Sequence, residues 1–367
     1  MDQIELTLFG PGFGECAVIH TGGHRWIVID SCLSRVSAGP AALQYLSGLG
    51  LEPANCVVLI VATHWHDDHI RGVSALVRAC PKATFCCSAA LGREEFESMV
   101  LAFDGQRMLR GGSGVKEINT VFNILRERPD SPPRLASASK TLLQIPADES
   151  GHGRSVRGVA LTPSDHEYIL AIAAVGKLMP KVRQNQIRCP SERPNLMSVA
   201  VHIAVGETSM LLGADLEQHS DARRGWTAVL ADTTLPKSRS VIFKVPHHGS
   251  QTAFSEEVWH TLLTQTPLAV TTPWVRSRTH LPAAEDIARI LKQTPNAFIS
   301  SRVAAGRSTV SRPPMVKRQL RDMGAKIKRI EAQMGAVRMR NGGNANWNHW
   351  TVTLHNDAWQ LTRQDAL

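Results

Sequence analysis

Short apolar runs alternate with turn-forming residues at the start of the chain. The runs cover residues 4–9, 16–20 and 26–30, and Gly22-Gly23 lies between the last two. A Gly-Gly pair between two such runs is typical of strands joined by a tight turn. We therefore expect an antiparallel meander over residues 4–30.

A continuous apolar run occupies residues 56–62, after a helix expected at 41–49. It reads Cys-Val-Val-Leu-Ile-Val-Ala and is rich in β-branched residues. Strands of this kind are buried on both faces of a sheet that helices cover. The pattern predicts a central strand, and a polar motif follows it directly.

The middle of the chain changes character twice. Residues 103–159 are polar and rich in Gly, Ser, Pro and Arg, and we expect an insertion there. Helix-like spacing within it joins Val115, Ile118, Phe122 and Leu125. Regular alternation then resumes, with strands expected at 198–204, 210–212, 241–245 and 268–271 and helices at 218–230 and 283–291.

Strand-like pieces return near the C-terminus, at 326–330, 336–340 and 350–354. A Gly/Asn turn separates the last two, which predicts a closing β-hairpin. The length of 367 residues allows one elaborated domain or two smaller ones. We expect a single domain over 1–367, with a basic, β-rich closing segment at 301–367.

The net charge of +9 is concentrated near the C-terminus. Between residues 301 and 340 the acidic residues are only Asp322 and Glu331. The basic ones are Arg302, Arg307, Arg312, Lys317, Arg318, Arg321, Lys326, Lys328, Arg329, Arg338 and Arg340. Such an excess favours polyanionic partners, and we expect nucleic acid to bind through this region.

Two compositional features bound the location of the protein. No apolar run reaches the length that a bilayer crossing needs, and the first ten residues contain acidic residues and no basic leader. We therefore expect a cytoplasmic protein without a membrane partner. The seven cysteines form no CxxC pair, and we assign them no chemistry.

The strongest chemical signal is the segment 63–69, Thr-His-Trp-His-Asp-Asp-His, just past the predicted central strand. His64 and His66 alternate, so both imidazoles can reach one metal ion, while Asp68 and His69 can reach a second. Imidazole with carboxylate suits zinc, manganese or iron. The alternative, a polar loop whose histidines cap strand and helix ends, explains one histidine better than it explains three. We expect two divalent ions, Zn²⁺ or Mn²⁺.

This segment resembles the HxHxDH signature of the metallo-β-lactamase superfamily, and other motifs resemble the hydrolase domain of ComEC-type competence proteins. In chain order they are Gly12-Phe13-Gly14-Glu15, Ile27-Val28-Ile29-Asp30, Asn195 to Val199, Leu211 to Glu217, Lys244 to Ser250, Thr279 to Pro282 and Gly324 to Met339. The resemblance covers most of the chain in one order. It implies an α/β fold, the αββα sandwich of two sheets covered by helices, with the metals at one edge.

The resemblance also implies roles for later residues. Asp215 corresponds to the carboxylate that joins the two metals, and one of His247 and His248 to a terminal ligand. His280 is a candidate ligand or proton donor. Asp30 is expected to orient a ligand histidine. The expected metal ligands are thus His64, His66, Asp68, His69, Asp215, His247 and His248, and the expected catalytic residues are Asp68, His248 and His280.

Departures from the family pattern remove no expected ligand. Ala214 replaces a glycine before the aspartate, Arg71 replaces a glycine after the first motif, and Leu281 separates His280 from the proline. The membrane channel of the competence proteins has no counterpart here, so DNA uptake is not implied. His166 is a further candidate ligand, although Ser164-Asp165-His166-Glu167 is also a good capping box for a helix.

Three functions compete at this stage. The first is a metal-dependent nuclease that cleaves DNA or RNA with a metal-activated water, which the basic C-terminal region favours. The second is a phosphodiesterase for a small molecule, such as a cyclic nucleotide or a phosphorylated headgroup. The third is a non-catalytic nucleic-acid-binding module, which the complete set of ligand types disfavours. Trp65 can stack on a base or pack under the loop.

Overall fold

The fold is known from a computed structural model. It describes residues 3–12, 14–34, 39–92, 114–128, 130–147, 154–178, 194–236, 238–276, 279–301, 314–323, 334–343 and 346–366. The expected strand at 326–330, Cys189 and much of the basic stretch between 302 and 333 lie outside these ranges.

The described strands form two large sheets. The first sheet has the order β17-β16-β1-β2-β3-β4-β5-β6. Its strands are β1 (Glu5–Gly12), β2 (Gly14–His20), β3 (Trp26–Ile29), β4 (Val57–Ala62), β5 (Thr84–Ser88), β6 (Arg134–Ala136), β16 (Gly335–Asn341) and β17 (Trp350–His355). Strands β1 to β3 pair antiparallel, as the meander predicts, and β3 to β6 pair parallel. The apolar run 56–62 is therefore an internal strand, as predicted.

The second sheet has the order β18-β15-β12-β11-β10-β9-β8-β7. Its strands are β7 (Thr141–Ile145), β8 (Val156–Ala160), β9 (Val201–Val205), β10 (Thr208–Leu212), β11 (Ser240–Lys244), β12 (Leu263–Thr271), β15 (Ala297–Ile299) and β18 (Trp359–Gln360). Strands β10, β11, β12 and β15 run parallel. A separate hairpin joins β13 (Trp274–Arg276) to β14 (Thr279–Leu281).

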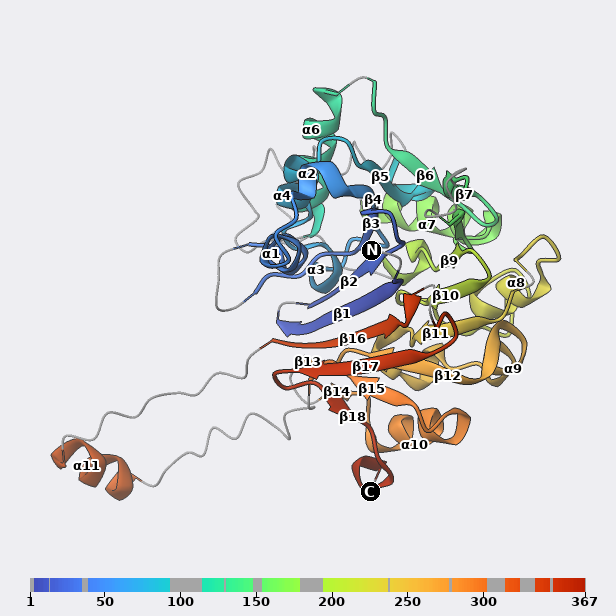
Figure 1. Ribbon diagram of the computed structural model, residues 1–367. Helices are drawn as coiled ribbons and strands as arrows, with labels where there is room; N and C mark the ends of the chain where they lie inside the picture. Colours follow the sequence, from blue (N-terminus) through green and yellow to red (C-terminus); the bar gives the residue numbers. More distant parts are fainter. Residues whose placement is uncertain are drawn as a thin grey trace.

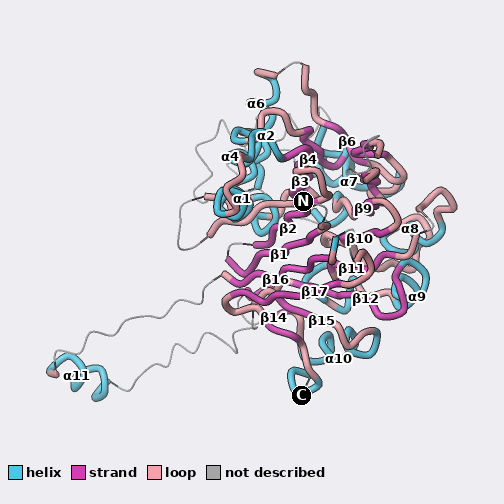
Figure 2. The backbone as a smooth tube through the Cα atoms, viewed as in Figure 1, coloured by secondary structure: helices cyan, strands magenta, loops and turns pink. Residues whose placement is uncertain are grey.

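Helices cover the outer face of each sheet, as Figures 1 and 2 show. The described helices are α1 (Ala41–Gly48), α2 (Pro53–Cys56), α3 (Asp67–Ile70), α4 (Val73–Ala79), α6 (Gly114–Arg126), α7 (Asp165–Leu178), α8 (Gly225–Ala231), α9 (Glu256–Leu262), α10 (Ala284–Gln293) and α11 (Pro314–Asp322). One apolar core joins the first sheet to α1, α4, α6 and α7, and another joins the second sheet to α8, α9 and α10. A third core lies between the sheets and draws on both. The fold is the expected α/β sandwich of four layers.

The sandwich brings carboxyl ends of strands to one edge. In the first sheet β3 and β4 end at Ile29 and Ala62, and in the second β10 and β11 end at Leu212 and Lys244. The amide of Val199 donates to the carbonyl of Thr63 at 3.0 Å, which joins the two sheets at this edge. Loops at the carboxyl ends of parallel strands can aim side chains at a common point. This edge is therefore where the chemistry of the sequence motifs meets.

The structure differs from the expected elements in two places. The helix expected at 218–230 is only α8, because Gly225 adopts φ +58 and a Cβ there would lie 2.0 Å from the carbonyl oxygen of Glu217. The polar stretch 103–159 contains α6, as its spacing predicts, but also β6, β7 and β8. These strands have three to five residues each, too few to show clear apolar alternation, and β6 and β7 lie at sheet edges, with β8 next to β7.

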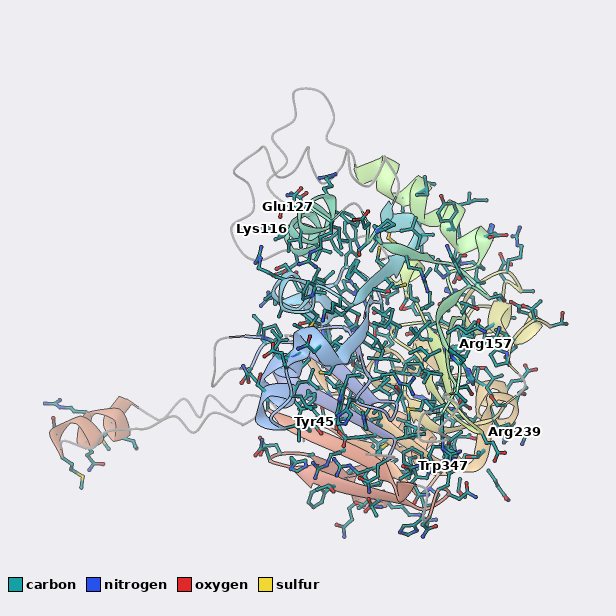
Figure 3. All side chains as sticks on the ribbon, turned by 45° about the horizontal axis from the view of Figure 1, so that its top comes forward. Tyr45, Lys116, Glu127, Arg157, Arg239 and Trp347 are labelled. Atoms are coloured by element: carbon teal, nitrogen blue, oxygen red, sulfur yellow. The ribbon has the colours of Figure 1, made fainter. Side chains whose placement is uncertain are left out.

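Trp65, whose role the sequence leaves open, and Trp347 are both packed against other side chains. The side chain of Trp65 is 6% exposed and belongs to the core under the first sheet. Trp347, labelled in Figure 3, lies under the guanidinium of Arg154, with Cζ 3.5 Å from the ring centroid. Both contacts agree with a packing role. None of the described helices is both long and apolar enough to cross a membrane.

A buried histidine of β9 predicts loss of stability in acid. Burial lowers the pKa of His202 from its ordinary 6.5 to about 4, and the bond to Ser238 only partly opposes this. A depressed histidine pKa contributes stability above 6.5 that is lost as the pH falls from 6.5 toward 4. Between pH 7 and 5 we expect His202 to cost about 1–2 kcal/mol. Urea unfolding of wild type and His202→Gln at both pH values measures this; equal pH dependence in the two proteins would refute it.

Candidate metal centre

The loops at the shared edge deliver one group of side chains from both sheets. His64, Asp68 and His69 follow β4, Asp215 follows β10, and His248 follows β11. His64 and His69 are fully buried, and Asp215 and His248 are 2% and 3% exposed. Asp68 and His248, 180 positions apart in the sequence, are brought within 3.3 Å of each other. The fold thus assembles these residues out of three separate motifs.

The Nε2 atoms of the buried histidines converge on two carboxylates. Asp215 lies between His64 and His69, with its oxygens 3.7 and 3.3 Å from their Nε2 atoms. Asp68 Oδ2 lies 3.3 Å from Nε2 of His248 and 3.9 Å from Nε2 of His69. His66 approaches from the partly exposed side, with its Nδ1 3.0 Å from Nε2 of His64. One set of imidazole and carboxylate donors therefore faces one small volume.

The opposite ring nitrogens of the first-sheet histidines face buried oxygens. Nδ1 of His69 donates to Asp30 Oδ2 at 2.7 Å. Asp30 also accepts from the amide and the hydroxyl of Thr63, both at 2.8 Å. That hydroxyl lies 3.0 Å from Nδ1 of His64. Asp30 thus contacts a candidate ligand histidine, as the family resemblance leads us to expect, and such contacts fix the direction in which the opposite ring nitrogen points.

A second buried carboxylate, Glu15, supports the site from β2. Its Oε1 lies 2.5 Å from Nζ of Lys244, and its Oε2 accepts from the Thr272 hydroxyl at 2.5 Å. Thr272 in turn contacts Nδ1 of His248 through its hydroxyl at 3.0 Å and its carbonyl at 3.2 Å. Sequence reasoning gave Glu15, Lys244 and Thr272 no role. Glu15 and Lys244 belong to two of the motifs that carry the family resemblance, and this membership is the feature of the sequence that points to them.

The donor set fits a pair of divalent ions. Two clusters of ligand-type side chains, His64/His69/Asp215 and Glu15/His69/His248, meet at His69, consistent with a binuclear site. Nε2 of His69 and Oδ1 of Asp215 are buried and form no hydrogen bond with the described residues. Buried polar atoms are normally bonded, so such a pair indicates a missing partner. A metal ion is the partner that accepts both an imidazole nitrogen and a carboxylate oxygen.

The charges of the cluster point the same way. Burial lowers the pKa of His64 well below its ordinary value, which leaves a neutral imidazole able to bind metal. Burial also acts to lower the pKa of His69, but the carboxylates of Asp215 and Glu15 raise it well above the ordinary value. Burial acts to raise the pKa of Asp215, and His69 holds it well below. The ionised carboxylates therefore favour the protonated, positively charged form of His69. A divalent cation bound at the site would supply this positive charge instead of the proton.

Several site residues hold an unusual backbone conformation. Positive φ values occur at Asp30 (60°), Ala214 (46°), His247 (47°) and His248 (54°). Residues with a Cβ rarely adopt this region, and such strain concentrates at functional sites. Ala214 holds this conformation although it has a Cβ. Its carbonyl accepts from Lys244 Nζ and from the His247 amide, both at 2.9 Å, which holds the turn.

This turn separates the two neighbouring histidines. His248 enters the cluster, whereas the His247 side chain is 23% exposed and contacts Thr252 at 3.1 Å and Glu217 at 3.5 Å. The structure therefore brings His248 of this pair to the other candidate ligands.

The remaining candidates lie outside both clusters. His166 is 3.7 Å from Asp221, and the Ser164–Glu167 capping box forms as its alternative interpretation predicts. His280 lies on β14, opposite Val275, and its Nδ1 is buried without a hydrogen-bond partner among the described residues. On the neighbouring strand, the Trp274 ring stacks on His248 at 6.4 Å. The β13–β14 hairpin therefore borders the site.

A comparison with protein families gives a match over part of the chain. Residues 9–131 match a family model described as the Metallo-beta-lactamase superfamily. Among curated proteins, none matches the sequence.

Solved structures with similarity include the Rm3 metallo-beta-lactamase, at 16% identity over 69% of this chain and 80% of that one, TM-score 0.33. The metallo-beta-lactamase fold protein YhfI from Bacillus subtilis has 12% identity over 66% and 70%, TM-score 0.33. A HARLDQ-motif metallo-beta-lactamase mutant, S60, from Cronobacter sakazakii has 13% identity over 62% and 70%, TM-score 0.31. Identities this low carry no information about substrate. Residues 9–131 thus match the model of the metallo-beta-lactamase superfamily, and the chain has the metallo-beta-lactamase fold, with two mixed sheets flanked by helices.

Proposed function

We propose that this protein is a metal-dependent phosphodiesterase and that its substrate is DNA or RNA. The observation that carries the hydrolase assignment is the pair of buried clusters sharing His69, with Asp215 between two histidines. The phosphodiester assignment is supported by the ordered motifs that resemble the hydrolase domain of ComEC-type competence proteins. The basic excess between residues 301 and 340 adds attraction for a phosphate backbone.

The proposed reaction needs residues that hold the ions and residues that orient the ligand side chains. Two divalent ions would activate a water and neutralise charge on the reacting phosphate. In this proposal His64, His66 and Asp215 would hold one ion, and Asp68, His69 and His248 would hold the other together with Asp215. Asp30 keeps Nε2 of His69 directed inward. These side chains are fixed before substrate arrives, which limits reorganisation during the reaction.

His280 is the proposed proton donor to the departing oxygen. His248 is the other candidate, but its Nε2 is directed at Asp68 and its Nδ1 at Thr272. His280 has a buried Nδ1 without a partner among the described residues. It therefore keeps a nitrogen that is not committed to the support of the metal site.

The test is cleavage of labelled linear DNA, circular DNA, RNA and cyclic dinucleotides with added Zn²⁺ or Mn²⁺. We expect polymer cleavage that falls at least about 100-fold in Asp68→Ala, since lost ligation costs several kcal/mol at the transition state. Asp67→Ala is the matched control, because the neighbouring Asp67 side chain is 44% exposed and pairs with Arg71.

Each other outcome contradicts the proposal in its own way. Turnover of cyclic dinucleotides alone would indicate a small-molecule phosphodiesterase. Tight DNA binding without turnover would indicate a binding module, and equal activity in the two alanine variants would mean that Asp68 has no place in the reaction.

A further inference from the structure

We infer that Lys244, Glu15 and Thr272 form a positioning unit that fixes the ring of His248 with its Nε2 directed into the metal site. The inference rests on the proposed metal site but not on the identity of the substrate. The three residues are 1–3% exposed, and the sequence alone assigns a role to none of them. They connect the second sheet to β2 of the first.

The direction of each hydrogen bond follows from what its atoms can donate. The Thr272 hydroxyl has one hydrogen, and this goes to the Glu15 carboxylate, which only accepts. Toward Nδ1 of His248 that hydroxyl oxygen can then only accept, and so can the Thr272 carbonyl beside it. Nδ1 of His248 must therefore carry the hydrogen. A neutral imidazole protonated at Nδ1 presents a lone pair at Nε2, which is the atom that faces Asp68.

Lys244 keeps Glu15 in the acceptor state that this arrangement needs. The Lys244 Nζ lies 2.5 Å from Glu15 Oε1, and both side chains are buried, so the ammonium compensates the charge of the carboxylate. The same ammonium donates to the carbonyl of Ala214, the residue before Asp215. One buried cation thus supports the acceptor behind His248 and the turn that presents Asp215. Because the ammonium lies against Oε1 of Glu15, Oε2 of this carboxylate remains the acceptor for the Thr272 hydroxyl.

The first sheet contains a similar arrangement of carboxylate, threonine and histidine on the other side of the site. Thr63 donates its hydroxyl hydrogen to Asp30 and therefore only accepts from Nδ1 of His64. A threonine bonded to a buried carboxylate thus stands behind a ligand histidine in each sheet. This repetition, from residues unrelated in sequence position, indicates that the arrangement sets ring orientation and is not incidental packing.

The experiment is Zn²⁺ binding to the full chain, measured by competition with a chromophoric chelator and by the absorption of the Co²⁺-substituted protein. Wild type is expected to bind two ions. In Glu15→Gln the side-chain carbonyl stays with Lys244 and the amide turns to Thr272, which reverses the donor direction. We expect the second ion to bind about 10–100-fold more weakly, with an altered Co²⁺ spectrum.

Thr272→Val gives an independent reading if Glu15→Gln fails to fold. It is expected to weaken the second ion in the same range, and Thr272→Ser, which keeps the hydroxyl, to restore binding. Thr294→Val is the matched control, because it removes a buried hydroxyl that bonds Pro267 at the end of α10.

Two ions bound with wild-type affinity by both Glu15→Gln and Thr272→Val would overturn the positioning unit and leave the proposed function intact. A wild type that binds no ion would overturn both.

Discussion

Replacing Asp215 by asparagine is expected to lower hydrolysis by about 10³-fold or more while leaving the fold in place. The Asp215 carboxylate is 2% exposed and lies within 3.7 Å of Nε2 of His64 and within 3.3 Å of Nε2 of His69. In the proposed site this carboxylate would hold both ions, and asparagine supplies neither its charge nor its second ligand oxygen. Loss of about 4 kcal/mol of transition-state stabilisation corresponds to this factor.

The measurement is kcat and kcat/KM on the best substrate of the cleavage panel, at fixed Zn²⁺ or Mn²⁺. Asp67→Asn is the control, since Asp67 belongs to the same short helix as Asp68 and pairs with Arg71 at the surface. Urea unfolding of both variants separates a catalytic loss from a folding defect. Activity of Asp215→Asn within tenfold of wild type would remove Asp215 from the centre of the site.

How far the sequence predicts this site depends on how far apart along the chain the residues of the site are. His64, His66, Asp68 and His69 share seven consecutive positions after an apolar strand, so their convergence is local and readable. Asp215 and His248 come from other motifs, and their place in the site was an inference from family resemblance alone. The structure brings them to the same edge because strands of two different sheets end there.

The supporting residues were beyond sequence reasoning. Thr272 and Glu15 are 257 positions apart, and no local pattern marks a threonine that will meet a buried carboxylate. Lys244 has the residue type least expected in a core, and only the structure reveals the partner that makes its burial tolerable. The role of a buried polar group can be inferred once its bonding partner is known, and that partner is set by the tertiary structure.

The fold shows the same dependence on range. Long apolar runs such as 56–62 identify their strands, because apolar residues at every position indicate a strand that is buried on both faces. The segment 218–224 was wrongly assigned to a helix, since nothing in its sequence reveals that the chain turns at Gly225 against Glu217. Short edge strands such as β6 and β7 take their place from the neighbours they pair with.

Removal of the metal is expected to destabilise the protein as well as to stop the reaction. Glu15, Asp30, Asp68 and Asp215 surround a few histidines at the buried edge, and Lys244 is paired with only one of them. An ion that binds the folded state alone adds about 4 kcal/mol of stability at a thousandfold excess over its Kd. For a chain of this size we expect the midpoint of thermal unfolding to fall by about 5 °C or more after chelation.

Thermal unfolding of Zn²⁺-loaded, chelator-dialysed and reconstituted protein measures this effect, alongside cleavage activity. His64→Ala is the diagnostic variant, because it removes a buried ligand and should respond less to added Zn²⁺ than wild type does. His166→Ala, whose imidazole faces Asp221 outside both clusters, should respond as wild type does. A chelated wild type that keeps its melting temperature and its activity would show that the buried carboxylates are balanced by protons on His69 and His248, and that the reaction needs no metal.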